Sequence, residues 1–106
     1  MSGWITIGKL IDIPRQGSRV VNTGVDDIAV FRTMTDEVFA LRDKCPHKGG
    51  PLSQGIVHGQ RVTCPLHNWV IELSSGNAVA PDTGCTMRYP VRLENGEVHL
   101  SLTPED

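Results

Sequence analysis

Short hydrophobic segments rich in valine, isoleucine and other β-branched residues recur along the chain, separated by turn-forming residues. Segments of this length and composition are typical of β-strands, and none has the sustained periodicity of a long amphipathic helix. The pattern therefore predicts an all-β fold, with strands at 4–13, 18–22, 28–32, 38–42, 56–57, 61–63, 70–72, 91–94 and 98–100.

Turn residues predict how several of these segments connect. Asn95-Gly96 lies between the last two predicted strands, and this dipeptide is a strong signal for a two-residue β-hairpin. Thr35-Asp36 and Gly59-Gln60 are expected to form further turns. No repeat, linker or low-complexity segment divides the chain, so the arrangement is that of a single unit.

Length and charge narrow the classes of function. A chain of 106 residues with a formal net charge of −2 is expected to form one domain over residues 1–106. Its scattered lysines and arginines argue against a nucleic-acid partner, and its apolar runs are too short for a membrane span. The first residues lack the basic and apolar regions of a secretory signal, so we expect a cytoplasmic protein.

Two pairs of metal-ligating residues stand out. One residue separates Cys45 from His47, two separate Cys64 from His67, and sixteen lie between the pairs. Thiolates are soft donors that suit iron–sulfur clusters, and neutral imidazole binds iron without adding negative charge. Such a set would hold a [2Fe-2S] cluster with both cysteines on one iron and both histidines on the other.

The predicted strands place both pairs on loops. The first pair follows the strand at 38–42, in a loop of about 43–55, and the second follows the strand at 61–63, in a loop of about 64–69. Pro46 and Pro65 directly follow the two cysteines and restrict the backbone there. Gly49, Gly50 and Gly55 are expected to let backbone pass close to the cluster.

The spacing of the four ligands resembles the Rieske family, and so do the flanking runs GPLSQG at 50–55 and HNW at 67–69. The stretches CPLHNWVIEL at 64–73 and DTGCTMRYPV at 82–91 resemble the small subunit of assimilatory NAD(P)H-dependent nitrite reductase. The likeness covers most of the chain from Trp4 to Leu100. It implies a Rieske-type iron–sulfur protein (ISP) domain, an antiparallel β-sandwich with a small cluster-binding subdomain.

The resemblance also implies a cofactor, a partner and a role. Cys45, His47, Cys64 and His67 would bind one Rieske 2Fe-2S cluster, and no residue of this chain would be catalytic. Flavin and sirohaem are expected only on a large catalytic nitrite reductase subunit. The chain would pass electrons to that subunit for the reduction of nitrite to ammonia in nitrate assimilation, and would not be active alone.

The second shell points to a low reduction potential within the family. Replacing two cysteines by histidines raises the potential from about −400 mV to a range of about −150 to +300 mV. In the Rieske family that this chain resembles, the high-potential members carry an extra disulfide between the two ligand loops. They also carry a serine that donates a hydrogen bond to a sulfide of the cluster. This chain has Lys48–Gly50, Leu66 and Asn68-Trp69 at those places, so we expect a value near the lower limit.

Alternatives remain for the four ligands. A free-standing Rieske ferredoxin that donates electrons to an oxygenase has the same ligand pattern, but usually has Gly where this chain has Asn68, and differs at Val70-Ile71. A structural zinc site is a third class, although a pair separated by one residue fits the usual zinc spacings poorly. A Rieske fold that has lost its cluster is disfavoured because all four ligands are present.

Other residues that could carry chemistry have simpler interpretations. Cys85 could belong to a loop at 80–85 that covers the cluster, but we favour a small buried hydrophobic residue. Trp69 is expected to pack against the core rather than to relay electrons. His58 and His99 fit no ligand pattern and are expected to be surface or structural residues.

Overall fold

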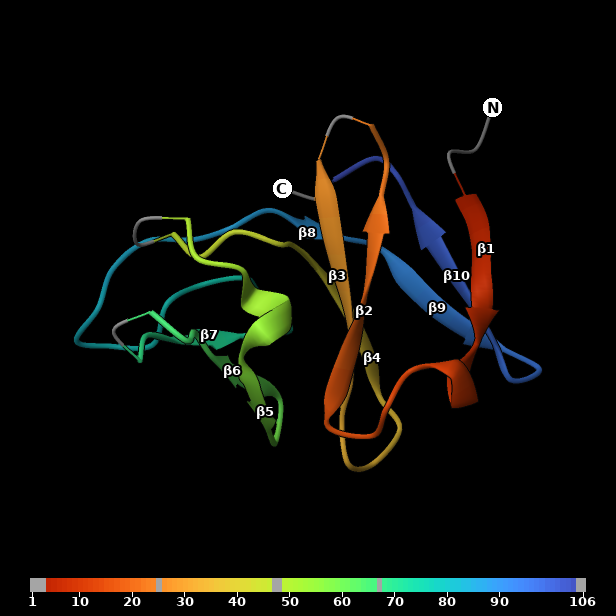
Figure 1. The fold of residues 1–106 in the computed structure, drawn as a ribbon, viewed down its shortest axis with the longest axis horizontal. Helices are drawn as coiled ribbons and strands as arrows, with labels where there is room; N and C mark the ends of the chain where they lie inside the picture. Colours follow the sequence, from red (N-terminus) through yellow and green to blue (C-terminus); the bar gives the residue numbers. More distant parts are fainter. Residues whose placement is uncertain (1–3, 25, 47–48, 67, 105–106) are drawn as a thin grey trace.

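The computed structural model describes residues 4–24, 26–46, 49–66 and 68–104, and its described part is almost entirely β-structure (Figure 1). Two short 3-10 helices interrupt the strands, η1 (Leu10–Asp12) and η2 (Leu52–Gln54). The strands are β1 (Trp4–Lys9), β2 (Gly17–Asn22), β3 (Asp27–Arg32), β4 (Val38–Arg42), β5 (Ile56–His58), β6 (Arg61–Thr63), β7 (Val70–Glu72), β8 (Arg88–Tyr89), β9 (Val91–Glu94) and β10 (Glu97–Ser101).

The described strands form three antiparallel sheets, in the orders β2-β3-β4-β8, β1-β10-β9 and β5-β6-β7. Figure 1 shows the four-stranded sheet in the middle, with the β1-β10-β9 sheet on one side and the small β5-β6-β7 sheet on the other. The antiparallel β-sandwich and its small subdomain, predicted from the family resemblance, are confirmed.

Strand β3 contributes to two hydrophobic clusters, one on each of its faces. Its alternate residues face opposite sides: Ala29 and Phe31 pack into the hydrophobic cluster on the side of the small sheet. Ile28 and Val30 pack into the cluster on the side of β1 and β10. All four are fully buried, so both faces of this strand are apolar and the run is continuous. A strand with one face in solvent would instead alternate apolar and polar residues.

The predicted strands agree with the observed ones at nearly every position, with two exceptions. The strand predicted at 4–13 ends at Lys9, because η1 follows and the Asp12 carboxylate accepts a hydrogen bond from the Lys9 N–H at 3.0 Å. β8 was not predicted, since two residues are too short to leave a pattern. The Asn95-Gly96 hairpin is confirmed: both residues have positive φ, of 52° and 79°, as a type I′ turn requires.

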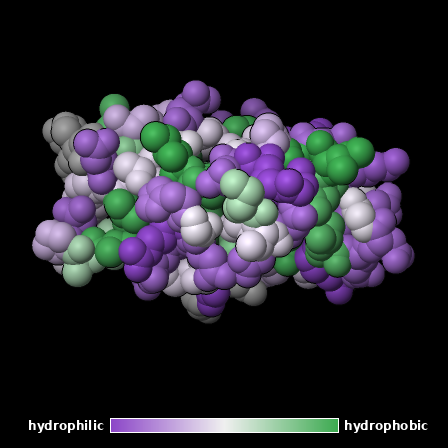
Figure 2. Space-filling model, turned by 90° about the horizontal axis from the view of Figure 1, so that it is seen from below, coloured by the Kyte–Doolittle hydropathy of each residue, from purple (hydrophilic) through white to green (hydrophobic). Residues whose placement is uncertain are grey.

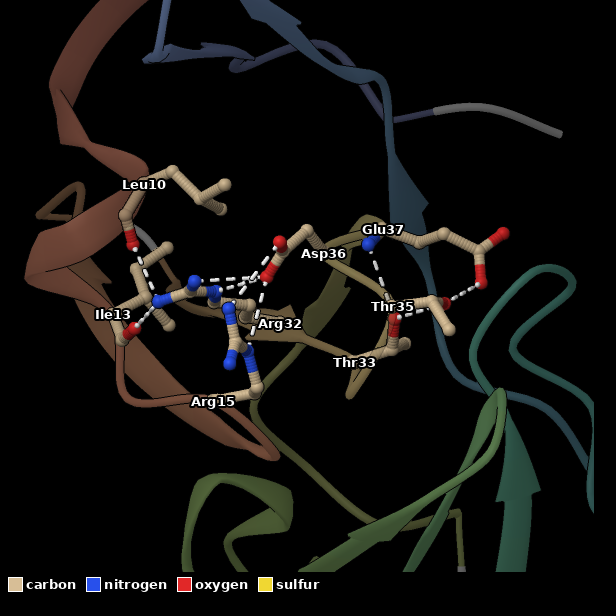
Figure 3. Close-up of polar contacts among 8 residues, drawn as sticks. All are labelled: Leu10, Ile13, Arg15, Arg32, Thr33, Thr35, Asp36 and Glu37. Atoms are coloured by element: carbon tan, nitrogen blue, oxygen red, sulfur yellow. Dashed lines mark hydrogen bonds and ion pairs between the residues drawn. The ribbon is translucent and has the colours of Figure 1, made fainter.

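A buried arginine ties the start of the chain to the β3–β4 turn (Figure 3). Arg32, whose side chain is 10% exposed, donates to the Ile13 carbonyl at 2.9 Å and to the Leu10 carbonyl at 3.4 Å. It also donates from Nε to Oδ1 of Asp36 at 2.9 Å, and Arg15 lies 3.3 Å from the same oxygen. The Arg32 hydrogen bond holds the pKa of Asp36 below its usual 3.8, although desolvation opposes it.

We expect Arg32→Met to lower the free energy of unfolding by about 2–3 kcal/mol at pH 7, because the Leu10 and Ile13 carbonyls lose their donor. The folded-state pKa of Asp36 is lowered, so the ion-pair contribution is present above pH 3.8 and is lost as the pH falls through that lowered pKa. The deficit of the variant should therefore narrow in acid without closing. Chemical denaturation from pH 7 to 2.5 measures this.

The control for that experiment is Arg61→Met, which removes an exposed arginine of β6. We expect a change within about 0.5 kcal/mol. Equal losses in the two variants at all pH values would contradict the structural role of Arg32.

The face of the molecule drawn in Figure 2 is mainly polar. Seen from below, Figure 2 shows apolar side chains in small groups among polar ones, with a larger group at the end formed by the β1-β10-β9 sheet. The described residues include no helix that is long and apolar enough to cross a membrane.

Candidate metal centre

Both predicted ligand loops lie where the sequence places them. The first connects β4 to β5 and contains η2, and the second is the hairpin loop between β6 and β7. Cys45 is therefore held by the four-stranded sheet and Cys64 by the small sheet. Two loops from different sheets converge on the same hydrophobic cluster, which contains both cysteines.

The first loop is closed at two levels. At its base, the Asp43 carboxylate accepts hydrogen bonds from the N–H and the hydroxyl of Ser53, both at 2.7 Å. Around the cysteine, the Cys45 N–H donates to the Gly50 carbonyl at 2.7 Å, and the Gly49 N–H donates to the Cys45 carbonyl at 3.0 Å. These bonds fix the backbone on both sides of Cys45, which preorganises its thiol.

The second loop is closed by the strands that it joins. Thr63 pairs with Val70 across the β6–β7 ladder, and the Cys64 N–H donates to the Trp69 carbonyl at 2.6 Å. Asn68 has a φ of 59°, the left-handed conformation that glycine and asparagine adopt most readily. The tight hairpin thus holds Cys64 at its base.

The two loops touch at Gly50. A Cβ atom at this position would lie 3.2 Å from the Cys64 sulfur and 2.8 Å from the Leu66 side chain. The backbone of the first loop therefore passes directly beside a cysteine of the second at Gly50, whereas a Cβ atom at Gly49 would meet nothing within 4 Å. This close approach needs a residue without a side chain.

Both cysteines are buried and neither forms a disulfide, with exposures of 3% for Cys45 and 0% for Cys64. Two soft ligands held on touching loops, with a glycine at the point of contact, fit one side of an iron–sulfur cluster. His47 and His67 lie outside the described residues. Among the residues that the structure describes, no three His, Cys, Asp or Glu side chains gather, so the full ligand set stays a prediction.

A third segment, residues 80–85, covers the two loops. A Cβ atom at Gly84 would lie 3.1 Å from Pro46 of the first loop and 3.9 Å from the Trp69 ring of the second. The segment is anchored where the Ala78 N–H donates to the Gly84 carbonyl at 2.9 Å. The loop at 80–85 thus packs against both cysteine-bearing loops.

The interpretation of Cys85 as a buried hydrophobic residue was wrong, because its thiol is exposed. The preceding Gly84 makes the contact with the loops, so Cys85 is left at the surface. The other two expectations are confirmed: Trp69 is partly buried and packs against the core cluster. His58 and His99 are hydrogen-bonded strand residues, to Thr63 at 2.7 Å and Thr6 at 2.9 Å.

The chain matches a known protein family and several known proteins. The family model described as the Rieske [2Fe-2S] domain matches residues 3–90. The ferredoxin subunit of anthranilate 1,2-dioxygenase from Burkholderia cepacia is 33% identical over 96% of this chain and 94% of that protein. The 4beta-methylsterol monooxygenase of Methylococcus capsulatus is 48% identical over 82% of this chain, which spans only 26% of that enzyme.

Solved structures with the same fold include a ferredoxin of an oxygenase system and proteins described as small subunits of nitrite reductases. A chain in a complex of reduced oxygenase and oxidized ferredoxin of carbazole 1,9a-dioxygenase has a TM-score of 0.88 and 25% identity, covering 100% of this chain and 99% of that one. The E. coli protein NirD has a TM-score of 0.80 and 29% identity, covering 95% and 97%. A protein described as an NADH-dependent nitrite reductase small subunit from Mycobacterium tuberculosis has a TM-score of 0.85 over 97% of both chains, and its 21% identity supports likeness of fold alone.

Proposed function

This chain belongs to the family of Rieske [2Fe-2S] domains, and from that premise we propose that Cys45, His47, Cys64 and His67 hold one [2Fe-2S] cluster. A bound cluster of this kind supplies one-electron transfer. The chain is thus an electron-transfer domain, a component of an oxidoreductase.

The described residues support this role in two ways: they bury both cysteines, and they fix the two ligand loops. The Cys45 and Cys64 thiols lie in a hydrophobic cluster with Phe31, Leu52 and other buried side chains, so water is kept from the cysteine side. The hydrogen bonds from the Cys45 and Cys64 N–H groups fix the backbone of both loops. Such a fixed, dry environment keeps a redox centre from rearranging when its charge changes.

We further propose that the chain is the electron-transfer small subunit of NAD(P)H-dependent nitrite reductase. The observation that supports this proposal is a contact between the two stretches that resemble that subunit, residues 64–73 and 82–91. Gly84 of the second stretch packs on Trp69 of the first, over Pro46 of the first ligand loop. The covering segment is therefore part of the site, and nitrite reduction would take place on a large sirohaem- and flavin-containing subunit.

A second candidate is a ferredoxin that donates electrons to an oxygenase, and the curated relatives favour it. The structure weakens one argument against it. The left-handed backbone at Asn68 suits glycine as well as asparagine, so the asparagine does not separate the two classes. The two candidates differ in the partner and not in the cluster.

Reconstitution with a partner tests the choice. We expect the isolated, reduced chain to reduce no nitrite, because the proposal assigns the nitrite-reducing sirohaem to the large subunit. Added to the sirohaem-containing large subunit from the same genome, it should support NAD(P)H-dependent ammonia formation. A preparation carrying Cys64→Ser should support only the background rate.

Two outcomes would contradict the nitrite reductase assignment. One is nitrite reduction by the isolated chain, and the other is full activity of the complex with the Cys64→Ser chain, which would indicate a scaffolding role. Efficient electron transfer to an aromatic-ring dioxygenase, without any effect on the large nitrite reductase subunit, would favour the second candidate.

A further inference from the structure

A hollow of about 470 Å³ opens beside the first ligand loop. It lies between that loop, the covering segment and β8, and Cys45 and Pro46 form part of its wall. Its remaining lining consists of Arg42, Lys44, Ser75, Asn77, Cys85, Thr86, Met87 and Arg88. A protein that docks here would contact the loop that holds a predicted cluster ligand.

The charge of the hollow differs from that of the chain. The chain has 12 acidic and 10 basic residues, yet the lining of this hollow includes three basic side chains and no carboxylate. On their other side, Arg42 and Lys44 line a smaller pocket with Asp26, Asp27 and Asp43. Arg88 is distant from Arg42 and Lys44 in the sequence and joins them because Leu41 pairs with Arg88 in the β4–β8 ladder. Inspection of the sequence alone gives no sign of this cluster.

The three cations differ in what already binds them. Arg42 forms an ion pair with Asp26 at 2.9 Å, and Arg88 donates to the Ser74 carbonyl at 3.0 Å. Lys44 is exposed and forms no ion pair within the described residues. Lys44 is therefore the cation that an incoming carboxylate can reach with the least rearrangement.

An apolar contact lies at the same place. Met87 is 46% exposed and lines both this hollow and a neighbouring one of about 370 Å³, which also includes Tyr89 and Leu102. Exposed methionine adapts to different partner surfaces and is enriched at protein interfaces. Three cations around an apolar residue suit a protein segment better than a small anion, which would leave Met87 uncovered.

We propose that this hollow is the docking site for an acidic segment of the large electron-transfer partner. Carboxylates of that segment pair with Lys44, Arg42 and Arg88, and its apolar side chains cover Met87. This inference rests on the proposed function, because the partner is taken to be the sirohaem-containing large subunit. It adds a contact that the ligand pattern does not imply.

The test measures binding of the cluster-loaded chain to the immobilised large subunit at about 20 mM and 300 mM NaCl. Lys44→Gln should weaken binding severalfold at low salt, and Lys44→Glu about tenfold or more. Both effects should shrink at high salt, since exposed charges are then screened. The matched control is Lys9→Gln, which removes an exposed lysine of β1, in a different sheet, and should bind like the wild type.

The outcomes separate this proposal from the function on which it rests. Wild-type binding together with unchanged binding of both Lys44 variants would overturn the docking site and leave the proposed function standing. If the wild-type chain binds at neither salt concentration, both the docking site and the proposed function are overturned. Iron content and the visible spectrum of each variant should match the wild type, because Lys44 is not a ligand, and a loss of cluster in Lys44→Gln would count against a pure docking role.

Discussion

Cys64→Ser is expected to yield a colourless protein that has lost both iron and acid-labile sulfide. The Cys64 thiol is fully buried and lies beside Gly50, where the two loops meet. No other described thiol can take its place unless the two loops move apart. A serine hydroxyl is a harder and weaker ligand for iron than a thiolate. Iron and sulfide analysis of purified protein measures the loss, with circular dichroism as a check of folding.

The matched control is Cys85→Ser. The Cys85 thiol is exposed and Cys85 is not one of the four predicted ligands, so this variant should keep the iron, the sulfide and the wild-type spectrum. Loss of the cluster in Cys85→Ser but not in Cys64→Ser would contradict the assignment of the two cysteines.

Gly55→Ala is expected to have the largest effect on stability. A Cβ atom at Gly55 would clash with the Thr63 carbonyl oxygen, which is a backbone atom and cannot move aside as a flexible side chain could. Relief requires β5 to move away from β6, the strand that leads directly to Cys64. We expect a loss of about 3 kcal/mol, at the upper end of the range for overpacking, and a melting temperature lower by about 10–20 °C.

Gly59→Asn controls for the loss of a glycine in the same small sheet. Gly59 has a φ of +57°, which asparagine tolerates, and nothing lies within 4 Å of a Cβ atom there. The melting temperatures of the two cluster-loaded variants should differ by most of the shift of about 10–20 °C expected for Gly55→Ala. Equal melting temperatures would mean that the small sheet adjusts to the extra atom, contrary to its close packing.

The strands and the two ligand loops were predictable because the signals for them are local. β-branched runs and turn residues mark each strand, and the Cys and His spacing follows directly after two of them. The Asn95-Gly96 hairpin was predicted for the same reason, since two positive φ angles are required at two consecutive residues. These features need no information about distant parts of the chain.

What was missed depends on contacts between distant segments. β8 exists only because Arg88 and Tyr89 find β4 as a partner. Cys85 was expected to be buried, as lone cysteines often are, and it is exposed because Gly84 occupies the contact with Pro46. The cationic hollow needs the same β4–β8 pairing to bring Lys44 close to Arg88, so neither its charge nor its shape could be predicted from the sequence.

Pulsed electron paramagnetic resonance of the reduced wild-type chain tests the central claim most directly, because it reports which nitrogens are bound to the iron. If Cys45, His47, Cys64 and His67 hold a [2Fe-2S] cluster, the spectrum should show strong coupling to two imidazole nitrogens, with the unpaired electron on the histidine-bound iron. A reduced cluster without nitrogen coupling, or a chain that binds zinc and gives no signal, would contradict it.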